Sequence, residues 1–193
     1  NLNRHLKEGY NLCDGVHCQS YKGKCNNGDI LRGTFESFSD VIVDSTNKLI
    51  STAYHSNSGG MTEDAYKIWQ VKVPYLSSII DTFSIGAKNY QWEKAIGKQQ
   101  WINYFVNQYG PEYKTPEKQE IIFNFQQKER TAKWIIEEDT IPTKNIRDYF
   151  NLRSSFFSVE MKKDSIYLHG KGYGHGVGLS QEGAIKMVQL GYS

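Results

Sequence analysis

The stretch that decides the fold is "GKGYGHGVGLSQEGA", residues 170–184, which places a glycine at every second position from 170 to 178. If this segment is extended, the glycines share one face, because side chains alternate across a strand. That face would be bare backbone against which another chain can lie closely. The other face would carry Lys171, Tyr173, His175, Val177 and Leu179. A glycine-rich structural turn around a core histidine is the alternative interpretation.

The second half of the same stretch predicts a helix. Ser180 is suited to the N-cap, Glu182 lies in the first turn, and Gly191 is suited to the position just after the last turn. A helix N-terminus offers unpaired N–H groups and a positive dipole, so it can hold a polar or anionic ligand. The run "GKGYGHG" is not a dinucleotide fingerprint, because no helix begins at the required point.

A second polar motif is "YHSNSGGMTED", residues 54–64. Its hydroxyl and amide groups both donate and accept hydrogen bonds, which suits recognition of sugar hydroxyls and N-acetyl groups. A Ser–His nucleophile pair lacks an assignable acidic partner here, and no Gly-x-Ser-x-Gly elbow is present. A polar turn after a strand is the simpler alternative.

Composition limits the function classes. Lys and Arg number 23 and Asp and Glu 21, a net charge of +2, so we expect no nucleic-acid partner. No apolar run approaches the ~18 residues that a membrane-spanning helix needs. The thirteen tyrosines and four tryptophans suit surfaces that stack on sugars, although core packing would use them equally well.

The remaining patterns predict an α+β fold with a largely antiparallel sheet, interspersed helices, and lobes that bound a groove. We expect hairpins over 41–56 and 155–172, the second turning at 162–165. We expect an edge strand over 71–79, and helices over 89–110 and 143–152. Residues 115–138 fit either a helix or a strand with a polar loop.

The first 25 residues contain all three cysteines, Cys13, Cys18 and Cys25, together with His5 and His17. Cysteine thiolates clustered with histidines are typical of a metal site, whereas an odd number of cysteines does not suit a complete disulfide framework. A Cys13–Cys18 disulfide and free thiols are the alternatives, and Cys25 has no assigned role.

Three segments carry a family resemblance: "HCQSYKG" (17–23), "AYHSNSGGMTE" (53–63) and "GKGYGHGVGLSQEGA" (170–184). They resemble, in the same order, signature segments of the stage II sporulation protein D family. Matches cover most of the chain and are weakest in its middle. The resemblance implies a lytic transglycosylase, a carbon–oxygen lyase that acts on cell-wall peptidoglycan during engulfment of the forespore.

The resemblance also implies the substrate, the chemistry and the location. The substrate would be glycan strands stripped of peptides by a partner cell-wall amidase, cut between N-acetylmuramic acid and N-acetylglucosamine. One carboxylic acid would protonate the glycosidic oxygen and then deprotonate the muramoyl C6 hydroxyl, leaving an anhydromuramoyl end. The protein would be membrane-anchored and extracytoplasmic, facing the intermembrane space from the mother-cell membrane.

The resemblance implies residue roles as well. Substrate would contact Tyr54, His55, Ser56, Ser58, Gly59, Gly60 and Thr62, faced by His175, Ser180 and Gln181. Zinc would be bound by His5, Cys13 and Cys18, leaving an open fourth position. The family's catalytic glutamate lies in a helical segment that we expect before Asn1, so residues 1–193 would form an incomplete catalytic domain. Glu63 is the best carboxylate within the chain, but we do not assign it as the acid.

The sequence is also compatible with two other functions. One is a noncatalytic glycan-binding module. The other is a zinc hydrolase of cell-wall peptides, although the His-Glu-x-x-His motif of such enzymes is absent.

Overall fold

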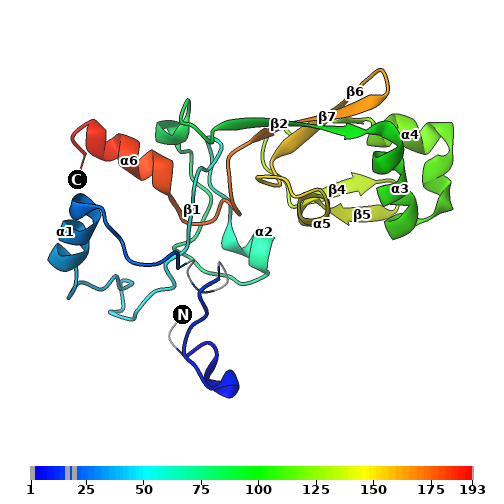
Figure 1. The fold of residues 1–193 in the computed structure, drawn as a ribbon. Coiled ribbons are helices and arrows are strands. Elements are labelled where there is room, and N and C mark those ends of the chain that lie inside the picture. The colour runs from blue at the N-terminus through cyan, green and yellow to red at the C-terminus, as the bar shows by residue number, and fades with distance from the viewer. Residues whose placement is uncertain (1–2, 16–17, 19–20, 193) are drawn as a thin grey trace. The chain divides into compact units, whose positions relative to one another are not determined.

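The computed structural model of the chain describes residues 3–15, 18 and 21–192. It divides into two compact units, Asn1–Leu49 and Ile50–Ser193 (Figure 1). Within the described residues, no helix has both the length and the apolar character needed to cross a bilayer.

The described residues of the first unit include a short 3-10 helix, η1 (Leu6–Glu8), and an α-helix, α1 (Gly28–Glu36). The side chain of Asn27 accepts hydrogen bonds from the first amides of α1 and so forms its N-cap. The hairpin predicted over 41–56 is confirmed only at its turn. There the Asp44 side chain accepts from the amides of Thr46 and Lys48, and a single bridge pairs Val43 with Leu49.

The second unit contains a four-stranded antiparallel sheet. Its strands are β2 (Gln91–Gly97), β3 (Asn124–Phe125), β6 (Phe157–Lys162) and β7 (Ser165–Lys171), in the order β2-β7-β6-β3. The predicted α+β class is therefore confirmed, and so is the hairpin over 155–172, whose strands pair from Phe157–Gly170 to Lys162–Ser165.

Helices and a second hairpin pack against this sheet (Figure 1). They are α3 (Lys98–Tyr109), η3 (Pro111–Lys114), α4 (Pro116–Ile122), α5 (Thr143–Tyr149) and the β4 (Lys133–Ile136)–β5 (Asp139–Pro142) pair. Their large side chains form one continuous apolar core in which Trp101, Phe105 and Tyr113 are fully buried. We call residues 91–171 the sheet lobe.

The prediction of a single helix over 89–110 is half wrong. Residues 91–97 form β2, and the helix begins only at Lys98. The spacing of four between Trp92 and Ile96 fits a helix face, but it also places both side chains on one face of a strand. Both are buried. Residues 115–138, left open above, form α4, β3 and β4 in turn.

The rest of the second unit, residues 50–90 and 172–192, we call the motif region. It contains α2 (Ala65–Trp69), η2 (Thr82–Ser84), α6 (Gln181–Gln189), and a parallel pair of two-residue strands, β1 (Tyr54–His55) and β8 (Leu179–Ser180). The edge strand predicted over 71–79 is wrong. The chain turns there, and Leu76 is buried in a small cluster with Ala65 and Val177.

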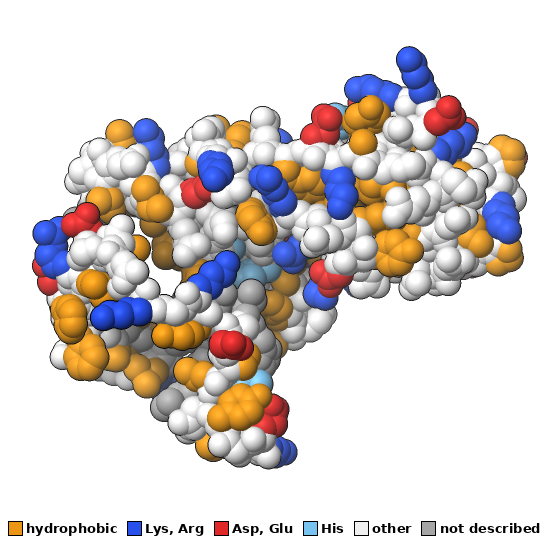
Figure 2. Space-filling view, viewed as in Figure 1, with side chains coloured by type: hydrophobic (Ala, Val, Ile, Leu, Met, Phe, Trp, Pro, Cys, Tyr) orange, Lys and Arg blue, Asp and Glu red, His pale blue; other side chains and the backbone are white. Residues whose placement is uncertain are grey.

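Charges of both signs are interspersed over the face drawn in Figure 2, as expected from nearly equal numbers of acidic and basic residues. This face shows no extended patch of one sign.

Candidate functional site

The two sequence motifs lie side by side and are joined by backbone hydrogen bonds. Tyr54 pairs with Leu179 and His55 with Ser180 in the β1–β8 ladder. Further along, the Asn57 and Tyr173 backbones exchange two hydrogen bonds of 3.2 and 2.9 Å. The prediction that these distant segments fold together is confirmed.

The alternating glycines of the glycine motif, residues 170–184, allow its backbone to lie this close to the first motif. Strand β7 ends at Lys171, and from 172 to 178 every second residue is a glycine with positive φ. A Cβ at Gly178 would lie 2.2 Å from the Ala53 carbonyl oxygen, and one at Gly172 would lie 2.7 Å from that of Asn57. The chain lying against these glycines is therefore the neighbourhood of the first motif.

The expectation of an extended segment with five side chains on one face is therefore wrong. Val177 is fully buried, whereas Tyr173 and Leu179 are exposed. The alternating left-handed conformations turn the backbone at each glycine, so the simple two-faced pattern of a strand does not apply.

A buried polar network lies beneath the first motif. The Ser58 hydroxyl is 2.7 Å from a carboxylate oxygen of Asp81 and 2.7 Å from the Ser84 hydroxyl. The Asn57 amide donates to the Ser84 carbonyl and to Glu182. Ser58 and Asn57 are fully buried, so these polar side chains hold the two motifs and the 81–84 segment together.

The N-terminus of α6 is occupied by groups of the protein itself. The Ser180 hydroxyl accepts from the Gly183 amide at 3.3 Å, as the N-cap prediction required. The Glu182 amide donates to the Ser56 carbonyl at 3.0 Å. The Glu182 carboxylate accepts from the Asn89 side chain at 2.7 Å. Of the amides expected to be available for a ligand, that of Glu182 therefore joins the two motifs and that of Gly183 is capped by Ser180.

Two imidazoles hydrogen-bond to the backbone of Val177, one at its carbonyl and one at its amide. Nδ1 of His55 lies 3.1 Å from the Val177 carbonyl oxygen, and Nδ1 of His175 accepts from the Val177 amide at 3.0 Å. A carbonyl only accepts, so neutral His55 carries its hydrogen on Nδ1; its unprotonated Nε2 is buried and has no hydrogen-bond partner among the described residues. Neutral His175 has the opposite tautomer, because its Nδ1 must be unprotonated.

Both imidazoles are neutral near pH 7. Burial lowers the pKa of His55 to about 4, with the hydrogen bond to Val177 acting in the opposite direction. Burial also lowers the pKa of His175 to about 4, and the positive charges of Arg147 and Arg130 add to the shift. We therefore assign these histidines to hydrogen bonding and ring packing near neutral pH.

The accessible part of the site is aromatic. The Trp69 ring, on α2, packs on the His175 ring with centroids 5.1 Å apart and remains 41% exposed. Tyr54 is 45% exposed, and its backbone hydrogen-bonds to His175. We call Tyr54, Trp69 and His175 the aromatic face. The sequence did not single out Trp69, the last residue of α2; its one signal was the general suitability of tryptophan for stacking on sugars.

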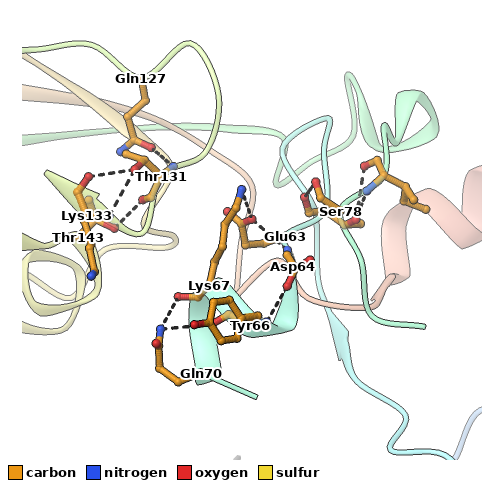
Figure 3. Close-up of polar contacts among 12 residues, drawn as sticks. Glu63, Asp64, Tyr66, Lys67, Gln70, Ser78, Gln127, Thr131, Lys133 and Thr143 are labelled. Atoms are coloured by element: carbon orange, nitrogen blue, oxygen red, sulfur yellow. Dashed lines mark hydrogen bonds and ion pairs between the residues drawn. The ribbon is translucent and has the colours of Figure 1, made fainter. Parts of the chain in front are cut away.

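Glu63 lies on the inner side of the first motif. It is fully buried, and its Oε1 accepts from the Asp64 amide at 3.0 Å and pairs with the Lys67 ammonium at 3.2 Å. Figure 3 shows Lys67 extending from α2 to this carboxylate. Glu63 is thus out of contact with any ligand on the surface.

The predicted substrate residues differ in accessibility. Tyr54 and Gln181 are exposed. Three residues are partly buried, namely Ser56, Gly60 and His175. Five are buried, namely His55, Ser58, Gly59, Thr62 and Ser180. Contact with substrate stays a prediction for these ten residues, as does the groove.

The predicted metal ligands meet in the first unit. One ligand atom from each of His5, Cys13 and Cys18 lies within 4.8 Å of the other two. Two sulfurs and one imidazole suit zinc in tetrahedral geometry. His5 Nδ1 lies 3.1 Å from a Glu8 carboxylate oxygen, and a carboxylate is a common partner for a zinc-binding histidine.

Other features of this cluster agree with metal binding. Burial tends to raise the pKa of Cys18, but hydrogen bonds from Cys13 and the charge of Arg4 outweigh it and lower that pKa. None of the three cysteines is in a disulfide. His17 lies outside the described residues, so its place relative to this cluster is not described.

This chain is similar in sequence to several known proteins. No protein-family model matches the chain. It is 29% identical to Stage II sporulation protein D of Bacillus amyloliquefaciens, over 76% of this chain and 42% of the relative. It is 28% identical to Stage II sporulation protein D of Bacillus subtilis, over 75% of this chain and 41% of the relative.

A third relative bears another name. The Amidase enhancer of Bacillus subtilis is 23% identical over 97% of this chain and 34% of its own length. The resemblance inferred from the motifs is confirmed by the first two names. The chain spans about two fifths of the length of those relatives.

Proposed function

We propose that this chain is the glycan-binding part of a lytic transglycosylase that acts on cell-wall peptidoglycan during sporulation. The observation that supports this proposal most strongly is the aromatic face. This face lies on two motifs that are held together by backbone hydrogen bonds and buried polar side chains. The names of the relatives support the sporulation context.

The aromatic face suits a sugar polymer. Exposed indole and phenol rings offer flat apolar surfaces, and the apolar faces of pyranose rings stack on such surfaces. His175 stays neutral and supports the Trp69 ring, so binding should not require a charged imidazole. Gln181, exposed at the start of α6, can exchange hydrogen bonds with hydroxyl or N-acetyl groups.

The catalytic acid is proposed to lie outside the motifs. Glu63 is buried and paired with Lys67, which supports the expectation of a separate glutamate. That acid would protonate the leaving oxygen and then act as base on the muramoyl C6 hydroxyl, so that no second carboxylate is needed. The amidase partner and the membrane-anchored, extracytoplasmic location belong to the same proposal.

The test is product analysis after the full-length protein has been incubated with peptide-free peptidoglycan strands. We expect anhydromuramoyl ends. Retained binding without products would instead support the noncatalytic glycan-binding module, and released peptides would support the zinc hydrolase. Trp69→Ala should weaken binding to the strands, whereas Trp92→Phe, at a buried ring of the sheet lobe, should leave binding unchanged.

Zinc is proposed as the metal of the first unit, bound by His5, Cys13 and Cys18. When bound, zinc would cross-link residues 5–18 through its three protein ligands and leave one of its four coordination positions open. Elemental analysis of protein purified without chelator should find about one zinc per chain. Cys13→Ser should abolish it, and Cys25→Ser should not. Less than about half an equivalent in the wild type would refute this assignment.

A further inference from the structure

Arg130 is a charged side chain outside both motifs that nevertheless touches both. It lies on the loop between β3 and β4 and is only 3% exposed. Its Nη2 donates to the Ser58 carbonyl at 2.7 Å. Its Cζ lies so close to Gly176 that an added Cβ there would be 2.7 Å away. One guanidinium therefore contacts the first motif and the glycine motif together.

The loop that carries Arg130 is fixed to the sheet lobe. The Gln127 side chain donates to the Ser155 carbonyl at 3.0 Å and accepts from the Thr131 amide at 2.9 Å. The Thr143 hydroxyl donates to the Thr131 carbonyl at 2.8 Å. Figure 3 shows Gln127 and Thr143 meeting Thr131. Arg130 thus extends from a braced loop toward the motifs.

The burial of this charge is costly. Nε and Nη1 of Arg130 are buried and have no hydrogen-bond partner among the described residues, and the same holds for Oε2 of Glu63. Burial lowers the pKa of Arg130 to about 10, and the negative charge of Glu63 opposes the shift. The side chain therefore stays cationic at neutral pH. Burying an arginine without full pairing costs free energy, so an apolar residue would serve stability alone better.

We propose that Arg130 is a positioning residue for ligand binding: it locks the two motifs from beneath and thereby fixes the His175 ring and the Trp69 ring that rests on it. The identity of the ligand, a chain of N-acetylated sugars, rests on the proposed function, but the positioning role does not. Gly176, which lies over the guanidinium, directly follows His175 in the chain.

The charge of Arg130 also acts on the two histidines. It opposes protonation of both His55 and His175. Three other groups act on these rings: a charged His175 opposes protonation of His55, Arg147 opposes protonation of His175, and Asp81 favours protonation of His55. Replacing Arg130 with a neutral residue should therefore raise the pKa of both imidazoles, which a purely steric role would not require.

The experiment compares Arg130→Met and Arg130→Lys with Lys128→Met, an exposed cation on the same loop, in the full chain. Isothermal titration measures affinity for a peptide-free peptidoglycan tetrasaccharide of alternating N-acetylglucosamine and N-acetylmuramic acid. Nuclear magnetic resonance follows the Trp69 indole and the titration of both histidines. We expect Arg130→Met to lose about tenfold or more in affinity, to shift the Trp69 resonance and to raise both pKa values. Arg130→Lys should lose less, and Lys128→Met should match the wild type.

The outcomes separate this inference from the proposed function. A folded Arg130→Met variant with wild-type affinity and an unmoved Trp69 resonance would overturn the positioning role. If the wild type fails to bind the tetrasaccharide, the proposed function fails, and the Trp69 and histidine resonances alone decide the positioning role. If Arg130→Met does not fold, Arg130→Lys decides: a shifted Trp69 resonance supports the role, and an unmoved one refutes it.

Discussion

The sheet lobe and the motif region of the second unit are held together by different forces. The sheet lobe surrounds a large apolar core that includes Trp101, Phe105 and Ile166. The motif region has a small cluster of Ala65, Leu76 and Val177, and relies on backbone pairing and buried hydroxyl, amide and carboxylate groups. A motif rich in polar residues can therefore be a structural device, and only its exposed members are free to bind a ligand.

The largest effect is expected in the sheet lobe. Trp101 is fully buried, and its indole N–H donates to the Ile122 carbonyl at 2.9 Å. Trp101→Ala should lower the free energy of unfolding by about 3–5 kcal/mol through lost apolar contact and a cavity. Urea denaturation measures this. A loss below about 1 kcal/mol would contradict an apolar core centred there.

The second largest loss of stability is expected where a glycine of the glycine motif packs against the first motif. Gly178 and Gly191 have similar positive φ angles of 75° and 85°, but only Gly178 abuts another backbone. Gly191→Ala should cost about 1 kcal/mol of unfolding free energy from backbone strain alone. Gly178→Ala should cost about 3 kcal/mol, since its Cβ also collides with Ala53. Equal losses in thermal or urea unfolding would show that the two motifs do not pack as described.

Acidification should weaken the motif region. The pKa of His55 is about 4 in the folded protein and near 6.5 when unfolded, so the unfolded chain takes up the proton first as pH falls. The contribution of His55 is complete above pH 6.5 and is lost toward pH 4. It should fall by about 2 kcal/mol between pH 7 and pH 5. His55→Gln should remove that part of the pH dependence of urea unfolding, and an unchanged slope would argue against a buried neutral imidazole.

The smallest effects distinguish structural from binding residues within the first motif. Ser58→Ala removes a buried hydroxyl and should cost about 1–2 kcal/mol of unfolding free energy, because Asp81 and Ser84 lose a partner. Tyr54→Ala, at an exposed position, should change stability by under about 0.5 kcal/mol but weaken glycan affinity. The reverse pattern in calorimetry and binding assays would place the ligand contact at Ser58.

The sequence pattern predicted the fold class, and the family resemblance implied that the two motifs meet. The Ser180 N-cap and the hairpin over 155–172 were also visible, because capping and turn residues act locally. The split of residues 89–110 into strand and helix was not visible. Trp92 and Ile96 satisfy both periods, and only pairing with Gly170 on a distant strand selects the strand.

The candidate site was predictable in its residues but not in their roles. Alternating glycines indicated close approach, but not that the approaching chain is Ala53 and Asn57 of the same protein. Arg130 lies far from both motifs in sequence, in a segment with no distinctive pattern, so only the structure reveals its contact with Ser58 and Gly176. Long-range polar contacts of this kind leave no local periodicity.

The most direct measurement uses the four tryptophan indoles as reporters of the two regions. Trp69 lies in the motif region, whereas Trp92, Trp101 and Trp134 lie in the sheet lobe. Nuclear magnetic resonance titration of the full chain with peptide-free peptidoglycan fragments should shift the Trp69 indole signal and leave those of Trp101 and Trp134 in place. Shifts confined to the sheet-lobe indoles, or no shift at all, would contradict a glycan-binding face built on the two motifs.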